Sequence, residues 1–205
     1  MVMETLTEFF SYVCGRNRCF VIDGQALPVC QRCLGLYAGV LCTLAWLVLS
    51  RAYRRGLPSR SITLLHIAMI LTAMAGGIHL LDPGPRWRLL CGLWTGHVIT
   101  LWLIGAGIQL RFLSDSRSVL QPPWRIQENI GALITASGVT LLALLFPYLQ
   151  ILGGFFWSIV ILLGFLAIGG ILLYSILSLT TYLKKHILKR IFSIVPTGLD
   201  RQEDR

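Results

Sequence analysis

The sequence has little charge, and most of the charge it has is of one sign. Only 13% of its 205 residues are charged, whereas 55% are hydrophobic. A soluble globular domain carries about 25% charged residues. This number of polar side chains is too small to cover a water-soluble particle. The composition therefore predicts that lipid surrounds most of the protein. The length suits one compact bundle and leaves little room for a second domain.

Acidic residues are scarce, with nine Asp and Glu against 18 Lys and Arg. The apolar runs contain almost none, which excludes the paired carboxylates of general acid–base catalysis. The sequence also lacks a nucleotide-binding loop, a serine-hydrolase elbow and the HExxH helix of a zinc protease. A transporter usually has broken helices or an inverted repeat, and Gly76-Gly77 and Gly153-Gly154 are too little to indicate either.

The basic residues lie in short segments between apolar runs, which is where membrane topology places them. Nucleic-acid binding would need basic side chains interleaved with aromatic ones on one face. We therefore expect the lipid bilayer as the main partner, no nucleic acid, and a homo-oligomer or membrane complex as candidate assemblies. Residues 1–12 have no basic start and no long apolar stretch, so they do not resemble a secretory signal. Their apolar spacing predicts one or two helical turns on the membrane surface.

Five apolar runs predict an all-α fold, a polytopic transmembrane helical bundle of about five spans. A crossing helix needs about 20 residues, so the uncharged stretch 130–183 is too long for one, and Pro147 and Gly153-Gly154 divide it. The expected spans are residues 33–50, 61–81, 89–110, 130–146 and 155–179. The chain then consists of a Cys-rich pre-membrane segment (1–33), a core of three spans (34–110), a polar loop (111–129), two further spans (130–183) and a basic tail (184–205).

The distribution of Lys and Arg predicts the orientation. The first loop has four, the third loop three and the tail six, whereas the opposite side has five. The more basic side is expected in the cytoplasm. This puts the C-terminus inside the plasma (inner) membrane of a prokaryote and the Cys-rich segment outside. With four spans instead of five, the two ends would share a side.

Four of the six cysteines lie in the pre-membrane segment, spaced C-x4-C-x10-C-x2-C. They are Cys14, Cys19, Cys30 and Cys33. Four thiolates can hold zinc, or another thiolate-bound metal, in a tetrahedron, and the spacing is similar to a zinc knuckle without matching a common pattern. Bound zinc contributes on the order of 10 kcal/mol, enough to order a short segment. A metal site is the first interpretation.

Two other interpretations stay open. Cys30 and Cys33 form a CxxC pair, and the nearby cations Arg18 and Arg32 favour thiolates. This is typical of a thiol–disulfide oxidoreductase, which could pass electrons to a quinone in the bundle. Structural disulfides are the third interpretation. The remaining cysteines, Cys42 and Cys91, are expected to pack within spans.

Ionisable residues near the spans are further candidates. Asp82 ends the second span and can pair with Arg88 or cap its Pro-Gly turn. It can also join His79, one turn earlier, as a ligand or proton acceptor.

Histidines inside the spans have several possible roles. His97 lies at a depth similar to that of His79, so the two could bind metal, relay protons in a small channel or carrier, or bond to neighbouring helices. We expect His66 and His186 to be interfacial.

Two small-residue motifs lie at similar depth in the first and third spans. They are Gly35-x-x-x-Gly39 and Gly92-x-x-x-Gly96, which predict close approach of the two helices. That approach would bring Cys33 and Tyr37 near the start of the third span, so the unusual residues would converge on one outward-facing site.

Two blocks of sequence resemble DUF2085, a family of small bacterial and archaeal membrane proteins. The family's first block has Cys-His, then Arg-Ser-Phe, then Pro-x-Cys-x-Arg-Cys-x-Gly-x-Tyr-x-Gly. Here it corresponds to the stretch from Cys14 to Gly39. The second block, an Asp followed by Arg-x-x-x-Gly-x-x-x-Gly, corresponds to the stretch from Asp82 to Gly96. The resemblance covers about residues 14–110 and implies a membrane protein without a known activity.

This chain departs from the family pattern at two positions. Gly15 stands where the family has His, and Cys19 stands where it has Ser. If the family's Cys and His residues form a metal site, Cys19 replaces the histidine ligand here. The same departure weakens any mechanism that needs that histidine as a base.

Overall fold

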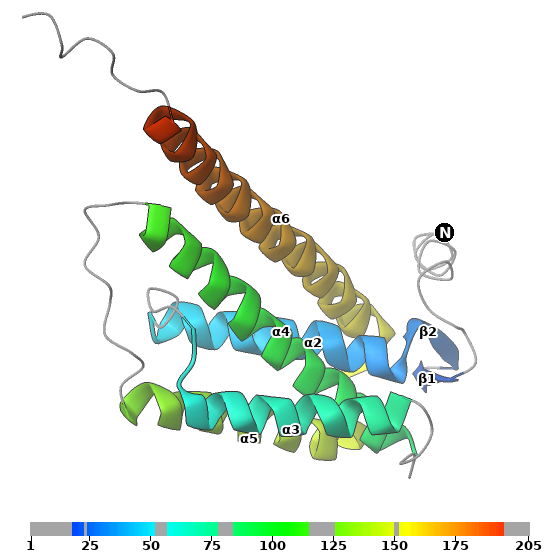
Figure 1. Ribbon diagram of the computed structural model, residues 1–205. Coiled ribbons are helices and arrows are strands. Elements are labelled where there is room, and N and C mark those ends of the chain that lie inside the picture. The colour runs from blue at the N-terminus through cyan, green and yellow to red at the C-terminus, as the bar shows by residue number, and fades with distance from the viewer. Residues whose placement is uncertain are drawn as a thin grey trace, which may run out of the picture.

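The computed structural model describes residues 18–22, 24–51, 57–77, 84–114, 126–149 and 152–194 (Figure 1). The predicted surface turns near the N-terminus lie outside these residues. A hairpin of two strands comes first, followed by helices at the places of the five expected spans. The elements are β1 (Cys19–Ile22), β2 (Gln25–Cys30), α2 (Gln31–Leu49), α3 (Arg60–Gly77), α4 (Pro85–Ser114), α5 (Ile126–Leu149) and α6 (Gly153–Ile194).

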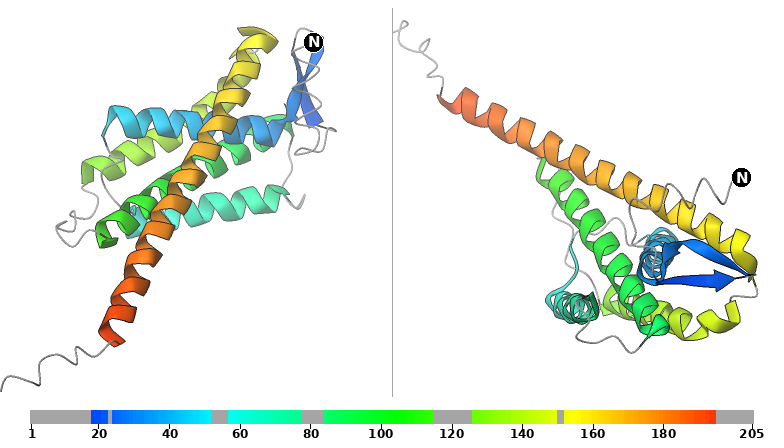
Figure 2. Two further views of the ribbon diagram at one scale, coloured as in Figure 1. Left: turned by 90° about the horizontal axis from the view of Figure 1, so that it is seen from above. Right: turned by 90° about the vertical axis from the view of Figure 1, so that its right-hand side faces the viewer.

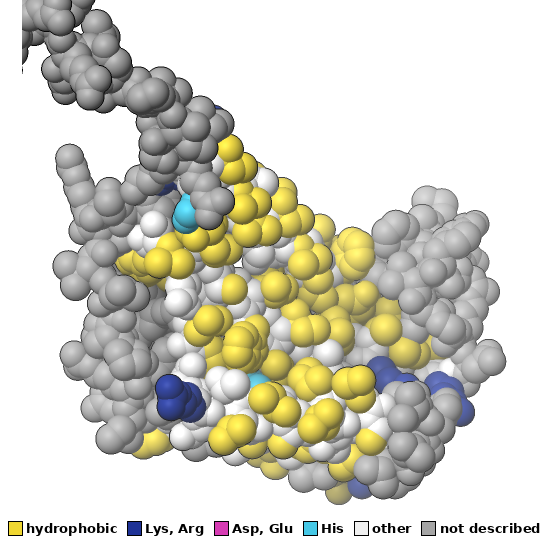
Figure 3. Space-filling model, viewed as in Figure 1, with side chains coloured by type: hydrophobic (Ala, Val, Ile, Leu, Met, Phe, Trp, Pro, Cys, Tyr) yellow, Lys and Arg dark blue, Asp and Glu magenta, His cyan; other side chains and the backbone are white. Residues whose placement is uncertain are grey.

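Three of the described helices have the length and composition of membrane spans. By length and composition, α2, α4 and α6 can cross a membrane, and α3 is a shorter apolar helix. Figure 3 shows hydrophobic side chains over most of the described surface of one face, with Lys and Arg towards its ends. A soluble protein would not expose so much apolar surface. The prediction of a helical membrane protein is therefore confirmed.

Besides the helices, the described chain contains a short hairpin that the sequence analysis does not predict. β1 and β2 form a two-stranded antiparallel sheet, with Val21 opposite Ala26 and Ile22 opposite Gln25. Gly24 lies in the turn with φ of 75°, a conformation that glycine adopts without strain. Gly24 therefore suits the tight turn that joins the two strands.

Pro28 lies inside β2, although proline cannot donate to a strand ladder. The register explains why it is tolerated. Cys19 pairs with Cys30 and Val21 with Ala26, so three residues of β2 face the single residue Phe20. Pro28 is the middle one of the three. In such a bulge the ladder does not need its missing N–H.

The last two helices differ from the expected spans at their ends. Pro147 does not end α5, which continues to Leu149, and Gly153, with φ of 76°, begins α6. α6 runs to Ile194, well beyond the expected end at residue 179. Lys and Arg are good helix formers, so a helix need not end with its apolar run. With 42 residues, α6 is longer than the bilayer core, and its C-terminal half extends away from the other helices (Figure 2).

The close packing of α2 against α4 is confirmed, and it is the most extensive contact between helices. A Cβ at Gly92 would lie 2.9 Å from the backbone nitrogen of Leu36 and closer still to the carbonyl oxygen of Arg32. A Cβ at Gly35, Gly39 or Gly96 would likewise overlap the backbone of the facing helix. Only glycine allows this approach, as in other small-residue helix contacts in membranes.

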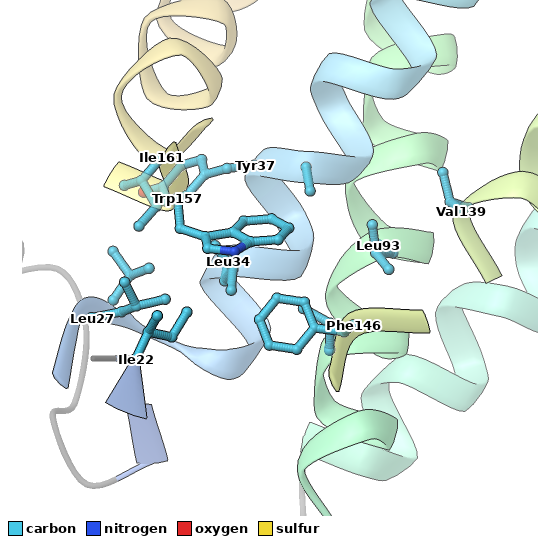
Figure 4. Packing of buried hydrophobic residues seen from close by; sticks show 12 residues of the cluster. Ile22, Leu27, Leu34, Tyr37, Leu93, Val139, Phe146, Trp157 and Ile161 are labelled. Atoms are coloured by element: carbon cyan, nitrogen blue, oxygen red, sulfur yellow. The ribbon is translucent and has the colours of Figure 1, made fainter. Parts of the chain in front are cut away.

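The hairpin is anchored in the main apolar core. Ile22 and Leu27 are buried and point towards Leu34 and Trp157 (Figure 4). Phe146 of α5 lies in the same cluster, with its ring centre 4.9 Å from that of Trp157. The strands that carry Cys19 and Cys30 are therefore held against α2, α5 and α6.

Replacing Gly92 with alanine should destabilise the protein, because its Cβ would push α2 and α4 apart. Overpacking of this kind costs about 1–3 kcal/mol. The matched control is Gly138→Ala in α5, where no described atom lies within 4 Å of the added Cβ. The control should be neutral or slightly stabilising. Thermal unfolding in mild detergent measures both variants, and equal stability of the two would contradict the role of Gly92.

Candidate thiol site at the start of α2

Three of the four predicted ligand cysteines lie where the hairpin meets α2. Cys19 and Cys30 are directly opposite each other in the ladder. Directly opposite residues have Cβ atoms about 4.5–5.5 Å apart on the same side of the sheet. Cys33 lies in the first turn of α2, near Cys30, and all three are partly exposed. The fourth cysteine, Cys14, lies outside the described residues.

Cys30 is the N-cap residue of α2. The first amide N–H groups of a helix have no partner within the helix and make its N-terminus favourable for negative charge. The first turn of α2 contains no acidic residue that would compete for this position. Cys30 therefore lies at the end of α2 that favours negative charge.

The nearby arginines connect helices. Arg32 donates a hydrogen bond from Nη2 to the carbonyl oxygen of Gly76, in the last turn of α3. Arg88, near the start of α4, donates from Nη1 to Oε1 of the buried Gln31 over 3.2 Å. The carbonyls of a last turn lack helical partners and attract cations. These two bonds bring the start of α2, the end of α3 and the start of α4 together.

In the described part of the chain, the other predicted accessory residues do not gather at the start of α2. Arg18 is exposed just before β1. Tyr37 is buried, with its ring centre 6.5 Å from that of Phe165 in an edge-on arrangement, and it packs against Gly164 of α6. His79 and Asp82 lie outside the described residues.

The predicted zinc site is not assembled in the part of the chain that the structure describes. No three His, Cys, Asp or Glu side chains among those residues come together as a metal-holding group. Since Cys14 lies outside them, the four-cysteine ligand set remains a prediction.

The histidines differ from expectation. His66 was expected at the interface, but only 2% of it is exposed, and its ring centre lies 5.5 Å from that of the fully buried His97. Both lie about equally far from the connection between α3 and α4. His66 comes eleven residues before the last residue of α3, and His97 comes twelve residues after the first residue of α4. With the spans expected at 61–81 and 89–110, His66 lies fifteen residues before the end of one and His97 eight after the start of the other, so the expected bounds concealed the pair.

The comparison with protein families confirms the resemblance. Residues 14–102 match the family DUF2085, described as a predicted membrane protein. The match includes the hairpin, α2, α3 and the first part of α4, whereas α5 and α6 lie outside it. No curated protein and no solved structure matches the chain.

Arg32→Met should loosen the junction of α2 and α3, because methionine keeps the apolar stem but cannot donate to Gly76. Loss of a hydrogen bond from a charged group costs about 1.5–3 kcal/mol. Arg86→Met removes an exposed arginine from the same end of the bundle and is the control. Thermal unfolding should separate the two variants clearly. An equal loss for both would show that net charge, and not the Arg32 bond, stabilises this end.

Proposed function

We propose that the start of α2 is a thiol–disulfide exchange site, with Cys30 as the attacking sulfur and Cys33 as the resolving one. The observation that supports this best is the position of Cys30 at the helix N-cap with Cys33 in the following turn. The pair is partly exposed and lies where the hairpin meets α2, so a partner can reach it. The partner would be another protein or a small molecule that carries a disulfide.

The exchange is balanced without a further reagent. The Cys30 thiolate attacks one sulfur of the partner's disulfide, forming a mixed disulfide and releasing the partner's other sulfur as a thiolate. The Cys33 thiolate then attacks the Cys30 sulfur. The partner leaves with both sulfurs reduced, and a Cys30–Cys33 disulfide remains. Two electrons have passed to the partner, and the reverse sequence oxidises a partner dithiol. After that reverse sequence Cys30 and Cys33 are reduced, and a membrane quinone that accepts two electrons and two protons would restore their disulfide.

A thiolate–metal site is the second candidate, and the pairing of Cys19 with Cys30 favours it. Cys33 follows in the first turn of α2. Cys14 would complete a tetrahedral set for zinc. Cys19 stands where the DUF2085 pattern has Ser, so this version of the site would be peculiar to chains with the same substitution.

We further propose five membrane spans, with the hairpin on the outer face of a prokaryotic plasma membrane. Lys184, Lys185, Lys189 and Arg190 near the end of α6 support a cytoplasmic C-terminus. An outer location would also expose the thiols to an oxidising compartment, where disulfide exchange has substrates.

Mixed-disulfide trapping separates the two functions. In oxidised glutathione, Cys33→Ser should accumulate glutathione on Cys30, because the resolving sulfur is missing. Cys30→Ser should accumulate far less, and the control Cys42→Ser, changed at an exposed α2 cysteine, should form the Cys30–Cys33 disulfide like the unaltered chain. Intact mass measures each species. About one zinc per chain, with cysteines alkylated only after chelation, would refute the exchange site and establish the metal site.

Orientation is tested with a membrane-impermeant maleimide in right-side-out and inside-out vesicles. The hairpin cysteines should be labelled in right-side-out vesicles only, since the charge distribution puts them outside. Labelling only in inside-out vesicles would put the hairpin on the cytoplasmic side and contradict the proposed topology.

A further inference from the structure

The buried pair His66 and His97 lies outside the thiol site, and one ring nitrogen of each has a partner. Trp102 donates from Nε1 to Nδ1 of His66 over 3.1 Å. Nδ1 of His97 lies 2.9 Å from the hydroxyl oxygen of Thr43. The hydrogen bonds therefore connect α3 with α4, and α4 with α2.

These partners determine where each imidazole proton lies. The indole N–H can only donate, so Nδ1 of His66 carries no proton, and the proton of this neutral ring is on Nε2. The Thr43 hydroxyl donates its hydrogen to the carbonyl oxygen of Gly39 over 2.7 Å. Thr43 must then accept from Nδ1–H of His97, which as a neutral ring has its lone pair on Nε2.

The two remaining nitrogens are complementary. Nε2 of His66 is a donor and Nε2 of His97 is an acceptor. Both atoms are buried and have no hydrogen-bond partner within the part of the chain that the structure describes. Only 2% of His66 and 0% of His97 is exposed. Buried polar groups are costly unless they are bonded, above all in a membrane.

We propose that one water molecule binds between His66 and His97, accepting a hydrogen bond from Nε2–H of His66 and donating one to Nε2 of His97. The ring centres are 5.5 Å apart, which is within the span of two hydrogen bonds of about 2.9 Å that meet at an angle. Water both donates and accepts, as the two nitrogens require. A metal ion bridging both Nε2 atoms would need the His66 proton to move to Nδ1, where Trp102 already donates.

With the water in place, the hydrogen bonds point in one direction throughout. They run from the Trp102 indole through His66, the water, His97 and Thr43 to the Gly39 carbonyl. The hydrogen-bond network ends at an indole and at a backbone carbonyl, and neither is titratable. The network therefore holds α3 to α2 and α4 and does not conduct protons. That assignment argues against a channel or carrier that uses His97 as a relay.

Nitrogen-15 NMR of histidine-labelled protein in detergent or nanodiscs tests the site directly, because the chain has only four histidines. Single His→Gln variants assign the signals. We expect His66 with its proton on Nε2, His97 with its proton on Nδ1, and a cross peak between the His66 Nε2–H and water. Equimolar Zn²⁺ should leave both rings unchanged. A proton on Nε2 of His97, no water cross peak, or a Zn²⁺-induced shift of both Nε2 signals would overturn the proposal.

Two threonine variants provide a matched comparison that does not remove a histidine. Thr43→Val removes the acceptor for His97 and should shift its tautomer towards Nε2–H. Thr100→Val is the control, since Thr100 is equally buried and donates over 2.7 Å to the carbonyl of Gly96. This control should leave the His97 signals unchanged. If both variants changed them equally, the effect would come from loosened helices and the hydrogen-bond chain would be refuted.

Discussion

Direct backbone contact between α2 and α4 is the constraint on which the other described elements depend. In a bilayer, helices gain nothing by hiding apolar side chains from lipid, so they associate mainly through van der Waals packing and hydrogen bonds. Gly35 and Gly39 face Leu89, Gly92 and Leu93, while Gly92 and Gly96 face Arg32 and Leu36. The contact therefore fixes the depth of α2 relative to α4. It also fixes where the hairpin and its cysteines lie, since β2 continues directly into α2.

The polar groups of the protein follow from this arrangement. At the outer end of the proposed topology, Arg32 and Arg88 bond to a carbonyl and an amide oxygen on neighbouring helices. In the interior, Thr43 and Thr100 bond to the carbonyls of Gly39 and Gly96, so these hydroxyls remain satisfied next to the glycine contact. α3, which packs less extensively, is held at two levels, by Arg32 near its end and by His66 further in.

Features set by local chemistry could be predicted from the sequence. The glycine motifs predicted the α2–α4 contact, and the CxxC pair marked the start of the first span. The strands were missed because each is short and Pro28 argues against a regular strand. Only the pairing, which needs Cys19 opposite Cys30, shows that Pro28 lies in a bulge. The end of α6 was missed because hydropathy reports where lipid ends and not where the backbone stops being helical.

The interior polar site could not be predicted in the same way. The partnership of His66 with Trp102 depends on the rotation of α3 against α4, which two apolar helices without a clear polar face do not specify in sequence. His97 was identified as a candidate, but its partner Thr43 lies on a third helix. Contacts of this kind depend on the assembled bundle and not on spacing along the chain.

The rate of cysteine alkylation tests whether the glycine contact positions the hairpin and its cysteines. The reduced protein would be treated with a small iodoacetamide, and modification of Cys30 and Cys33 would be followed by mass spectrometry in the Gly92→Ala and Gly138→Ala variants under conditions where both remain folded. We expect both thiols to react at a clearly altered rate in Gly92→Ala and at the unaltered chain's rate in Gly138→Ala. Unchanged rates in Gly92→Ala, together with lowered stability, would show that the hairpin keeps its position without the contact.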